Sequence, residues 1–546
     1  MKKVKYVVVT GGVLSGLGKG VVTSSIGKLI QAQGYNVSIV KIDPYINVDA
    51  GTMRPTEHGE VYVTDDGGET DQDIGNYERF LDQSLSRKHN ITTGQVYLEV
   101  IQRERNLEFE GKCVEVIPHI PNEVQRRVKE VAKHDNSDFV IIEIGGTVGD
   151  YQNVLFLEAF REMNLHTDRV VFVHVVFLPI PSNLGEMKTK PAQHSVRELN
   201  SIGIQPDFII ARSRCDIDDV RRKKLSLFCN VLPENVINAP DLKSIYEEPL
   251  VFEKQTLVKK ILAEFKLKYK KDTPKMKEWR RFVSKMGKVK KKVKIGIVGK
   301  YFDIGDFTLD DSYISVIEAV KHASWKYGLC PEIEWLDSKK FENGKSSLKE
   351  LKKLDGIIIP GGFGSSGVEG KINAIRFCRE NKIPFLGLCY GLQLAVVEFS
   401  RNVAGMKNAN STEINPDTKY PVIDLQPEQK ELMKQHNYGN TMRLGAYPAN
   451  LKKGSLVWKL YGKKDKVSER HRHRYEVNPE FVPVLVENGL MFSGVYPKRN
   501  LMEFIELKNH PFFVATQAHP ELKSRPLNPH PLFLGFIKAA SERKKK

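Results

Sequence analysis

The chain has 546 residues, which is too long for one hydrophobic core and predicts two or three domains. Hydrophobic residues make up 40% and charged residues 28%, the balance of a soluble globular enzyme. No apolar run approaches the roughly 20 residues of a membrane-spanning helix, which argues against an integral membrane protein. The N-terminus passes directly into a predicted strand without a secretory cleavage pattern, so the expected location is the cytoplasm.

The formal net charge of +17 is concentrated outside the predicted folded parts. Residues 266–294 carry fourteen Lys or Arg and two acids, and residues 542–546 carry four basic residues and one acid, which gives +12 and +3. A nucleic-acid-binding module is expected to carry its charge on a folded face together with aromatic side chains. The distribution therefore favours a solvated connector and tail, with no specific nucleic-acid partner.

Six cysteines are scattered without a C-x-x-C pair or a metal-like spacing. In a chain of this size that pattern argues against both a disulfide framework and a zinc site. We expect reduced thiols, of which one or two have a chemical role. The six are Cys113, Cys215, Cys229, Cys330, Cys378 and Cys389.

Short, apolar, β-branched runs alternate with helical patterns in both halves of the chain. This alternation predicts an α/β fold with two doubly wound, mostly parallel-sheet domains covered by helices on both faces. We expect the first domain over residues 1–268, a basic linker over 269–292, and a second domain over 293–546 that includes the basic tail. The predicted strands are Tyr6–Thr10, Val37–Asp43, Phe139–Ile144, Val170–Phe177, Phe208–Arg212, Val293–Gly299, Gly356–Pro360, Pro384–Leu388 and Phe513–Gln517.

A glycine-rich segment, residues 10–20, follows the first predicted strand and opens a helix. It reads Thr-Gly-Gly-Val-Leu-Ser-Gly-Leu-Gly-Lys-Gly. Glycines at such a junction let backbone N–H groups approach phosphate oxygens, and the N-terminus of the helix adds its dipole. Lys19 is placed to neutralise the β- and γ-phosphates. The segment therefore predicts a nucleoside triphosphate site rather than a simple strand–helix turn.

Gly20 stands where such loops normally carry the Ser or Thr that binds Mg²⁺, so the metal ligands must come from elsewhere. Two carboxylates are suitably placed. Asp73 follows a Gly-Gly-Glu-Thr-Asp-Gln run, and Glu143 lies near the end of a buried strand, where a parallel sheet faces its ligand. Magnesium prefers one or two carboxylates together with phosphate oxygens and water. We therefore predict Asp73 and Glu143 as metal ligands.

In the second half, Cys389 lies in Gly-Leu-Cys-Tyr-Gly directly after a predicted strand. The flanking glycines permit the sharp strand-to-helix turn that exposes a nucleophile at the edge of a sheet. The helix N-terminus favours a thiolate, and the backbone N–H of Tyr390 can face an oxyanion. The run Gly361–Gly364, after another predicted strand, can supply a second oxyanion donor.

His519 and Glu521 follow the last predicted strand, within Gln-Ala-His-Pro-Glu. A cysteine nucleophile with a histidine base that a carboxylate orients is a set for acyl transfer. Each of the three residues alone has a structural explanation. Because all three follow predicted strands and a glycine loop accompanies them, they predict an acyl-transfer site.

Together these motifs resemble CTP synthases along essentially the whole chain. The first half resembles their amidoligase domain, and the second half resembles a class I glutamine amidotransferase domain. Glutaminase domains occur in many enzymes, so the runs that narrow the resemblance are Lys41–Asp49 and Lys188–Ser195. The other matching runs are 11–20, 58–61, 143–150 and 470–476.

The resemblance implies that ATP phosphorylates O4 of UTP, that ammonia attacks C4 and that phosphate leaves, as the last step of de novo CTP biosynthesis. It implies that Lys41 adds positive charge near the phosphates and that Mg²⁺ is bound by Asp73 and Glu143. The implied ATP contacts are Gly16, Leu17, Gly18, Lys19, Gly20, Val21, Asp73, Pro240, Asp241 and Leu242. The implied contacts of UTP, or of CTP as feedback inhibitor, are Ser15, Asp150, Tyr151, Gln152, Lys188, Thr189, Lys190, Pro191, Ala192, Gln193 and Lys224.

For the second half, the resemblance implies that Cys389 forms a glutamyl thioester, that His519 acts as base and that Glu521 orients it. It also implies a homotetramer with UTP sites at subunit interfaces, GTP as allosteric activator, and an ammonia tunnel walled by Pro55, His58 and Val61. The implied glutamine contacts are Gly362, Tyr390, Gly391, Leu392, Gln393, Glu413 and Arg474.

Two positions depart from the family pattern. Family members usually carry an arginine in the lid after the oxyanion glycines, where this chain has Ser366, so the usual GTP activation is not expected to carry over unchanged. Many relatives carry a glutamate where this chain has Gln152. A neutral amide still donates and accepts hydrogen bonds, so CTP feedback is expected with altered strength.

Two other hypotheses remain open from the sequence. Another glutamine-dependent ATP amidoligase, such as a cobyrinate-amidating enzyme, shares the phosphate loop and the glutaminase but does not need the cluster Lys188–Gln193. A non-catalytic nucleic-acid-binding or scaffold protein is suggested only by the basic linker.

Overall fold

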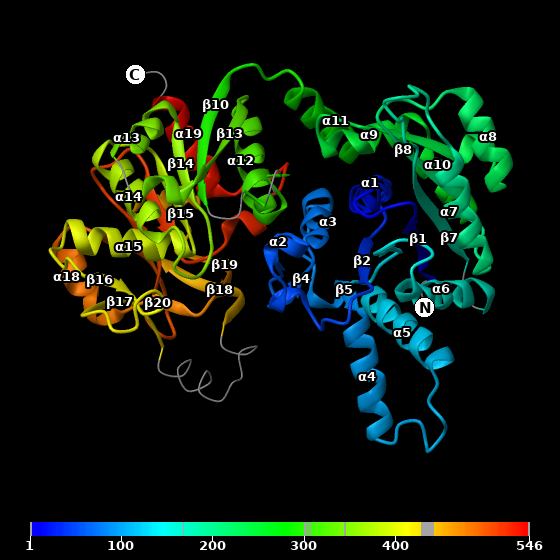
Figure 1. The fold of residues 1–546 in the computed structure, drawn as a ribbon, viewed down its shortest axis with the longest axis horizontal. Helices are drawn as coiled ribbons and strands as arrows, with labels where there is room; N and C mark the ends of the chain where they lie inside the picture. Colours follow the sequence, from blue (N-terminus) through cyan, green and yellow to red (C-terminus); the bar gives the residue numbers. More distant parts are fainter. Residues whose placement is uncertain are drawn as a thin grey trace. The chain divides into compact units, whose positions relative to one another are not determined.

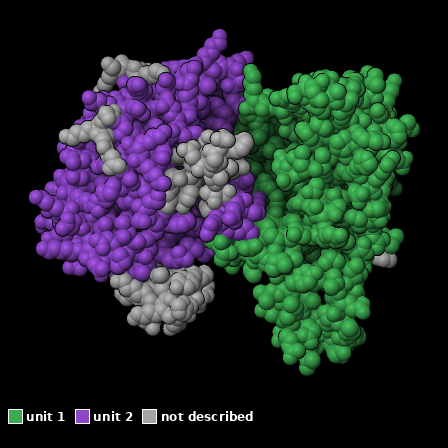
Figure 2. Space-filling view, viewed as in Figure 1, with its two compact units in different colours: residues 1–52, 73–284 green, residues 53–72, 285–546 purple. Residues whose placement is uncertain are grey.

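The computed structural model describes most of the chain as two compact units (Figure 2). The described residues are 3–166, 169–299, 303–304, 307–308, 310–342, 345–426 and 442–543. The first unit comprises residues 1–52 and 73–284, and the second comprises residues 53–72 and 285–546. The chain therefore leaves the first unit after residue 52 and returns to it at residue 73. The sequence pattern does not reveal this excursion.

The first unit is built on a seven-stranded sheet in which every neighbouring pair is parallel (Figure 1). The strand order is β5-β2-β6-β1-β7-β8-β9, so the chain starts in the middle of the sheet and extends to both edges. This arrangement confirms the parallel α/β prediction for this half. The strands are β1 Lys5–Gly11, β2 Val37–Asp43, β5 Asn90–Thr92, β6 Phe139–Ile144, β7 Val170–Phe177, β8 Phe208–Ser213 and β9 Val236–Pro240.

Helices cover both faces of this sheet because successive strand residues point to opposite sides. Val8 and Ile142 pack against α5 and α6. Ile39 and Ile141 face α1, where Gly27 permits close approach: a Cβ at Gly27 would lie 2.9 Å from Ile39 Cδ1. The helices are α1 Lys19–Ala32, α3 Asp73–Leu81, α4 Thr93–Arg105, α5 Val116–His134, α6 Val154–His166, α7 Lys190–Ser201, α8 Asp219–Cys229, α9 Glu248–Lys254, α10 Leu257–Glu264 and α11 Pro274–Met286.

The segment predicted as a basic linker contains helix α11, which packs on the first unit. Trp279 of this helix is fully buried, and its indole N–H donates to the backbone carbonyl of Tyr246 at 3.1 Å. Its ring lies 5.6 Å from that of Phe80, and the Lys28 ammonium lies 4.9 Å from its centre. Part of the basic run is therefore carried on an amphipathic helix whose apolar side is docked.

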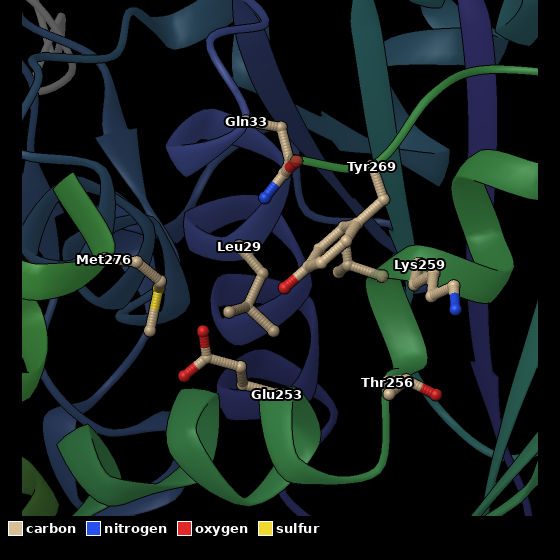
Figure 3. Close-up of a pocket in the computed structure, with 8 residues that line it drawn as sticks. Leu29, Gln33, Glu253, Thr256, Lys259, Tyr269 and Met276 are labelled. Atoms are coloured by element: carbon tan, nitrogen blue, oxygen red, sulfur yellow. The ribbon is translucent and has the colours of Figure 1, made fainter. Parts of the chain in front are cut away.

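A small pocket lies beside this helix (Figure 3). The hydroxyl end of Tyr269 points toward Leu29 there, and Gln33 exchanges two hydrogen bonds with the backbone of Lys270, at 2.7 and 3.1 Å. The pocket shares no residue with the predicted sites. Its lining is Leu29, Gln33, Glu253, Thr256, Val258, Lys259, Tyr269 and Met276.

The second unit is built on a nine-stranded sheet of order β13-β10-β14-β15-β23-β22-β21-β18-β19 (Figure 1). Neighbouring strands are parallel from β13 to β23 and antiparallel from β23 to β19. The predicted strands of this half correspond to β10, β14, β15 and β23. The strands are β10 Lys292–Gly299, β13 Cys330–Asp337, β14 Gly356–Ile359, β15 Phe385–Leu388, β18 Arg443–Leu451, β19 Lys466–His473, β21 Met491–Tyr496, β22 Leu501–Glu506 and β23 Phe513–Thr516.

This sheet is also covered on both faces. Ile357 and Phe385 pack with α14 and α15, and Ile358 and Leu386 pack with α12 and α19. Of the helices in the described ranges, none combines the length and apolarity that crossing a bilayer requires. The helices are α2 Pro55–His58, α12 Ile314–Lys326, α13 Lys345–Leu348, α14 Val368–Glu380, α15 Tyr390–Asn402, α17 Leu456–Leu460, α18 Val482–Glu487 and α19 Pro531–Arg543.

Three small sheets complete the fold. Two are antiparallel pairs, β3 with β4 and β11 with β12, and the third has the order β16-β17-β20. Their strands are β3 Tyr62–Val63, β4 Glu69–Thr70, β11 Asp303–Ile304, β12 Phe307–Thr308, β16 Ala409–Ser411, β17 Tyr420–Leu425 and β20 Tyr475–Val477.

We expect Trp279→Ala to lower the free energy of unfolding of the first unit by about 3–5 kcal/mol, because it removes a large buried side chain and leaves a cavity. Arg281→Ala, an exposed change on the same helix, should shift it by no more than about 0.5 kcal/mol. Denaturant unfolding of the two variants measures the difference. Similar values for both would contradict the docked position of α11.

Candidate functional site

The predicted phosphate loop connects β1 to α1 at the carboxyl edge of the first sheet. Gly16 and Gly18 adopt positive φ angles of 73° and 83°, and Gly18 is the N-cap of α1. Lys19 is buried, and its ammonium donates to the carbonyl oxygen of Gly146, after β6, at 2.8 Å. Burial lowers the pKa of Lys19. The loop thus combines the free N–H groups of a helix N-terminus with one buried amine.

Three carboxylates surround the ammonium of Lys41 at the same edge. Lys41 pairs with Asp73, with Glu143 at 3.1 Å and with Asp43 at 3.7 Å. Tyr77 of α3 donates its hydroxyl hydrogen to the Glu143 carboxylate. Burial raises the pKa of Glu143. Burial acts the same way on Asp73, but the charge and hydrogen bond of Lys41, together with the charge of Lys19 and a hydrogen bond from Asn76, outweigh it, and the pKa of Asp73 is lowered. The structure therefore brings Asp73 and Glu143 together around one cation.

Asp73 reaches the phosphate loop at Gly20. A Cβ at Gly20 would lie 2.2 Å from Asp73 Oδ1 and 2.9 Å from its Cγ, far inside van der Waals contact. A Ser or Thr at this position would require the Asp73 carboxylate to move. The carboxylate thus stands next to the loop where other phosphate loops place a hydroxyl, which explains the unusual Gly20.

The chemistry of this cluster fits a magnesium ion. Carboxylate oxygens are the hard ligands that Mg²⁺ prefers, and the space that a Cβ of Gly20 would fill holds one of them. Within the described residues, no three His, Cys, Asp or Glu side chains have the geometry of a metal site. Asp73 and Glu143 suit the kind of site in which one or two protein carboxylates are completed by phosphate oxygens and water.

The other predicted nucleotide residues lie at several places in the first unit. Pro240 ends the edge strand β9, and the N–H of Asp241 donates to the carbonyl of Ser213 at 2.9 Å. Thr189 and Gln193, at the start of α7, are buried and joined by a hydrogen bond of 3.1 Å. Leu17 and Ala192 are buried, Val21, Lys188, Pro191 and Leu242 are half-buried, and Ser15, Gly16, Asp150, Tyr151, Gln152, Lys190 and Lys224 are exposed.

Arg212 lies at the same edge and is a candidate that the sequence analysis does not include. It stands near the end of β8, and its guanidinium donates to the carbonyls of Ala239 and Pro240, each at 3.3 Å. Its Nε would lie 3.8 Å from a Cβ on Gly18 of the phosphate loop. An arginine at the carboxyl end of an apolar parallel strand is the signal that points to it.

A buried hydrogen-bond chain links β1 to α7 beneath the loop. The Thr10 hydroxyl lies 2.8 Å from His174 Nδ1, and His174 Nε2 lies 2.7 Å from the Ser195 hydroxyl. Burial lowers the pKa of His174 to about 3, so the imidazole is neutral at neutral pH. In the sequence, His174 is visible only as an interruption of an apolar run.

In the second unit, Cys389 occupies the predicted elbow between β15 and α15. It is buried, is the N-cap of α15 and has a positive φ of 50°. A Cβ at Gly391 would lie 2.3 Å from the Ile359 carbonyl oxygen, and one at Gly387 would lie 2.9 Å from the Gly391 backbone. Both flanking glycines are therefore required by close backbone approach.

The predicted base and its carboxylate meet beside this thiol. His519 Nδ1 lies 2.6 Å from Glu521 Oε1. Burial alone would lower the pKa of His519, but the charge of Glu521 and the charge and hydrogen bond of Cys389 raise it well above its usual value. A Cβ at Gly361 would lie 2.8 Å from His519 Cε1, so the glycine loop also adjoins the imidazole. The structure thus brings the three predicted residues and the loop together.

The residues predicted to hold glutamine surround this centre. The N–H of Gly364 donates to Glu413 at 2.7 Å, and the Tyr390 hydroxyl donates to the Gly364 carbonyl at 2.7 Å. Burial raises the pKa of Tyr475, Glu413 adds to this shift and Arg474 opposes it, so both charges lie near that ring. Gln393, Leu392 and Gly391 are buried on α15, and Gly362 lies next to the ring of Tyr390.

The residues predicted to wall a tunnel belong to the excursion 53–72. Pro55 and His58 bound α2, Val61 is half-buried, and His58 Nδ1 lies 3.5 Å from an Asp71 carboxylate oxygen. Ser366, at the position that departs from the family pattern, is exposed between the glycine loop and α14.

Both halves of the chain match known families. A family model described as CTP synthase N-terminus matches residues 5–267, and one described as glutamine amidotransferase class-I matches residues 308–539. A curated CTP synthase of Pyrococcus abyssi is 53% identical to the chain, and the match covers 99% of this chain and 98% of that protein. A curated CTP synthase of Methanocaldococcus jannaschii is 52% identical, and the match covers 99% of each chain. The solved glutaminase domain of Trypanosoma brucei CTPS with bound acivicin is 38% identical, covering 46% of this chain and 94% of that one, with a TM-score of 0.43. The chain belongs to the CTP synthase family.

Proposed function

We propose that the chain converts UTP to CTP, with ATP to activate the pyrimidine and glutamine to supply ammonia. One observation supports this above all: a single polypeptide carries a phosphate loop with carboxylates grouped on a buried lysine, and also a thiol beside a histidine–carboxylate pair. The first arrangement suits phosphoryl transfer, and the second suits amide hydrolysis. Membership of the CTP synthase family selects the substrates.

In the first unit, O4 of UTP attacks the γ-phosphorus of ATP, the bond to ADP breaks, and 4-phosphoryl-UTP forms. Lys19 and the N–H groups of the phosphate loop stabilise the charge on the transferred group. Asp73 and Glu143 would hold Mg²⁺, which would neutralise phosphate charge. Ammonia then attacks C4, and phosphate leaves with the former O4 oxygen.

In the second unit, the sulfur of Cys389 attacks the side-chain amide carbon of glutamine. His519 passes the thiol proton to the amide nitrogen, so ammonia leaves and a glutamyl thioester remains, which water hydrolyses to glutamate. Glu521 keeps the imidazole oriented, and the N–H of Tyr390 stabilises the oxyanion. Glu413 suits the α-amino group of glutamine, and Arg474 suits its α-carboxylate.

The same proposal includes the assembly and regulation that the family resemblance implies. The protein is a homotetramer with UTP sites between subunits, where Lys188, Lys190, Gln193 and Lys224 hold the nucleotide, and ammonia passes the 53–72 segment. CTP inhibits by occupying the UTP site. Ser366 in place of the lid arginine weakens activation by GTP.

The two alternative functions are not favoured. The amidoligase half matches the family model described as CTP synthase N-terminus over residues 5–267. The basic segment that suggests nucleic-acid binding carries a helix whose tryptophan is buried in the first unit.

Purified protein with ATP, Mg²⁺ and UTP should form CTP with either glutamine or ammonium as nitrogen source, because the pyrimidine is activated independently of the glutaminase. Absorbance or chromatographic detection of CTP, with and without GTP, is the measurement. Failure with both nitrogen sources over a range of salt and temperature would reject the proposed function.

Cys389→Ala should lower glutamine-dependent CTP synthesis about 10⁴-fold or more, since it removes the nucleophile, and leave ammonia-dependent synthesis intact. Cys378→Ala changes another buried cysteine, which lies on α14 rather than at the elbow; it serves as a matched control and should retain both activities. Equal loss of both activities in folded Cys389→Ala would contradict separate sites.

Asp73→Asn and Gly20→Ala should each lower both synthetic activities by at least roughly a hundredfold. The first removes a metal-binding charge, and the second places a methyl group where the Asp73 carboxylate lies. Glutamate release from glutamine, measured alongside, should persist because Cys389 is untouched. Asp82→Asn is the control, because Asp82 directly follows helix α3, which Asp73 begins; this variant should behave like wild type. Full activity in Gly20→Ala would show that Asp73 does not need its place beside the loop.

A further inference from the structure

A hairpin from the excursion 53–72 is part of the second unit. Its strands β3 and β4 pair through Tyr62 with Thr70 and Val63 with Glu69, and Tyr62, Val63 and Thr64 are completely buried. Figure 2 draws residues 53–72 in the colour of the second unit. The chain on either side of this excursion belongs to the first unit, so the N-terminal half supplies buried residues to the unit that holds Cys389.

The hairpin contacts the turn that carries the predicted base. The Tyr62 hydroxyl donates to the carbonyl oxygen of Leu522 at 2.6 Å. Leu522 directly follows Glu521, and its N–H donates to the His519 carbonyl at 3.2 Å. That bond closes the short 3-10 turn Pro520–Lys523, which holds Glu521 against His519. The tyrosine hydroxyl thus fixes the backbone immediately behind the His519–Glu521 pair.

Arg470 of β19 joins the hairpin to the same histidine. Its guanidinium donates to Asp65 at 2.7 Å and to the Tyr62 hydroxyl at 3.0 Å, while its carbonyl accepts the His519 N–H at 2.7 Å. The Arg470 side chain is completely buried. A buried guanidinium needs a charged partner to offset the loss of hydration, and Asp65 of the hairpin supplies it.

A second ion pair repeats this arrangement on the thiol side. Arg472 donates to Glu69 at 2.7 Å, and the Arg472 carbonyl lies 3.9 Å from the Cys389 sulfur. The hairpin backbone is also fitted closely to β18, because a Cβ at Gly445 would lie 2.6 Å from the Gly67 nitrogen. The backbone carbonyls of Arg470 and Arg472 thus lie next to His519 and Cys389, and the hairpin carboxylates of Asp65 and Glu69 bind the side chains of these two arginines.

We propose that the hairpin, residues 62–70, is a positioning element of the thiol site, with Tyr62, Asp65 and Glu69 as positioning residues. They touch no reacting atom; they fix the backbone segments on which His519 and Cys389 depend. The proposal rests on the glutaminase role proposed above. Since a misplacement of about 1 Å can cost on the order of a hundredfold in rate, loss of these contacts lowers turnover rather than glutamine affinity.

The test uses the full-length chain with Tyr62→Phe, Asp65→Asn and Glu69→Gln, each of which keeps side-chain size. We measure kcat and KM for glutamate release, ammonia-dependent CTP formation, and Tm. The proposal expects kcat for glutamate release to fall roughly tenfold or more in Tyr62→Phe and Asp65→Asn. KM for glutamine should stay within about twofold, and ammonia-dependent synthesis should match wild type.

Tyr461→Phe is the matched control, because it removes another buried tyrosine hydroxyl of the same unit, one that donates to Glu469 at 2.8 Å. It should lower Tm at least as much as Tyr62→Phe and leave kcat near wild type. Unchanged kcat in all three hairpin variants, or an equal loss of kcat in Tyr461→Phe, would overturn the positioning role. The kcat for glutamate release tests the positioning role of the hairpin and does not depend on CTP formation. If the wild-type protein makes no CTP from ammonia, that result rejects the proposed conversion of UTP to CTP, and the glutamate-release measurements still test the hairpin.

Discussion

The buried ammonium of Lys41 organises the candidate site of the first unit. Lys41 lies within reach of Asp43, Asp73 and Glu143, three carboxylates from β2, α3 and β6. Burying charges costs several kcal/mol per ion unless each has a partner, and removing one partner of such a group typically costs about 3–5 kcal/mol. The shared lysine allows the carboxylates to gather at the edge of the sheet. It makes the mutual position of β2, β6 and α3 a condition for folding as well as for the proposed binding of metal and phosphate.

The second centre depends on backbone geometry instead of charge. Cys389 has a positive φ, and its flanking glycines touch neighbouring backbone where no side chain fits. The parallel strands β14, β15 and β23 end side by side, and each delivers one part: the glycine loop, the thiol and the His519–Glu521 pair. Each half therefore places its candidate site at the carboxyl edge of its own parallel strands, and the chemistry proposed for the two sites differs, consistent with folds that host many functions.

The features that local patterns predict well are those that a short stretch of chain determines. The phosphate loop, the cysteine elbow and most parallel strands are visible because glycine placement and apolar runs are local signals. The partners of Arg212, Asp43 and His174 become apparent only when strands far apart in sequence lie side by side. The excursion 53–72 and the antiparallel half of the second sheet escape prediction for a similar reason: their residues pack against partners hundreds of positions away, such as Tyr62 against Leu522. Helix α11 was obscured by its lysines, since one buried Trp279 outweighs a face of solvated charges.

The contact between Gly20 and Asp73 also constrains how such a sequence can change over evolutionary time. A side chain at position 20 and the Asp73 carboxylate compete for the same space beside the loop. A side chain gained at position 20 therefore displaces the Asp73 carboxylate unless position 73 changes as well. Positions 20 and 73 are therefore expected to covary as a pair. Seen in the loop alone, Gly20 looks like the loss of a metal-binding hydroxyl, but it leaves the space that the Asp73 carboxylate occupies.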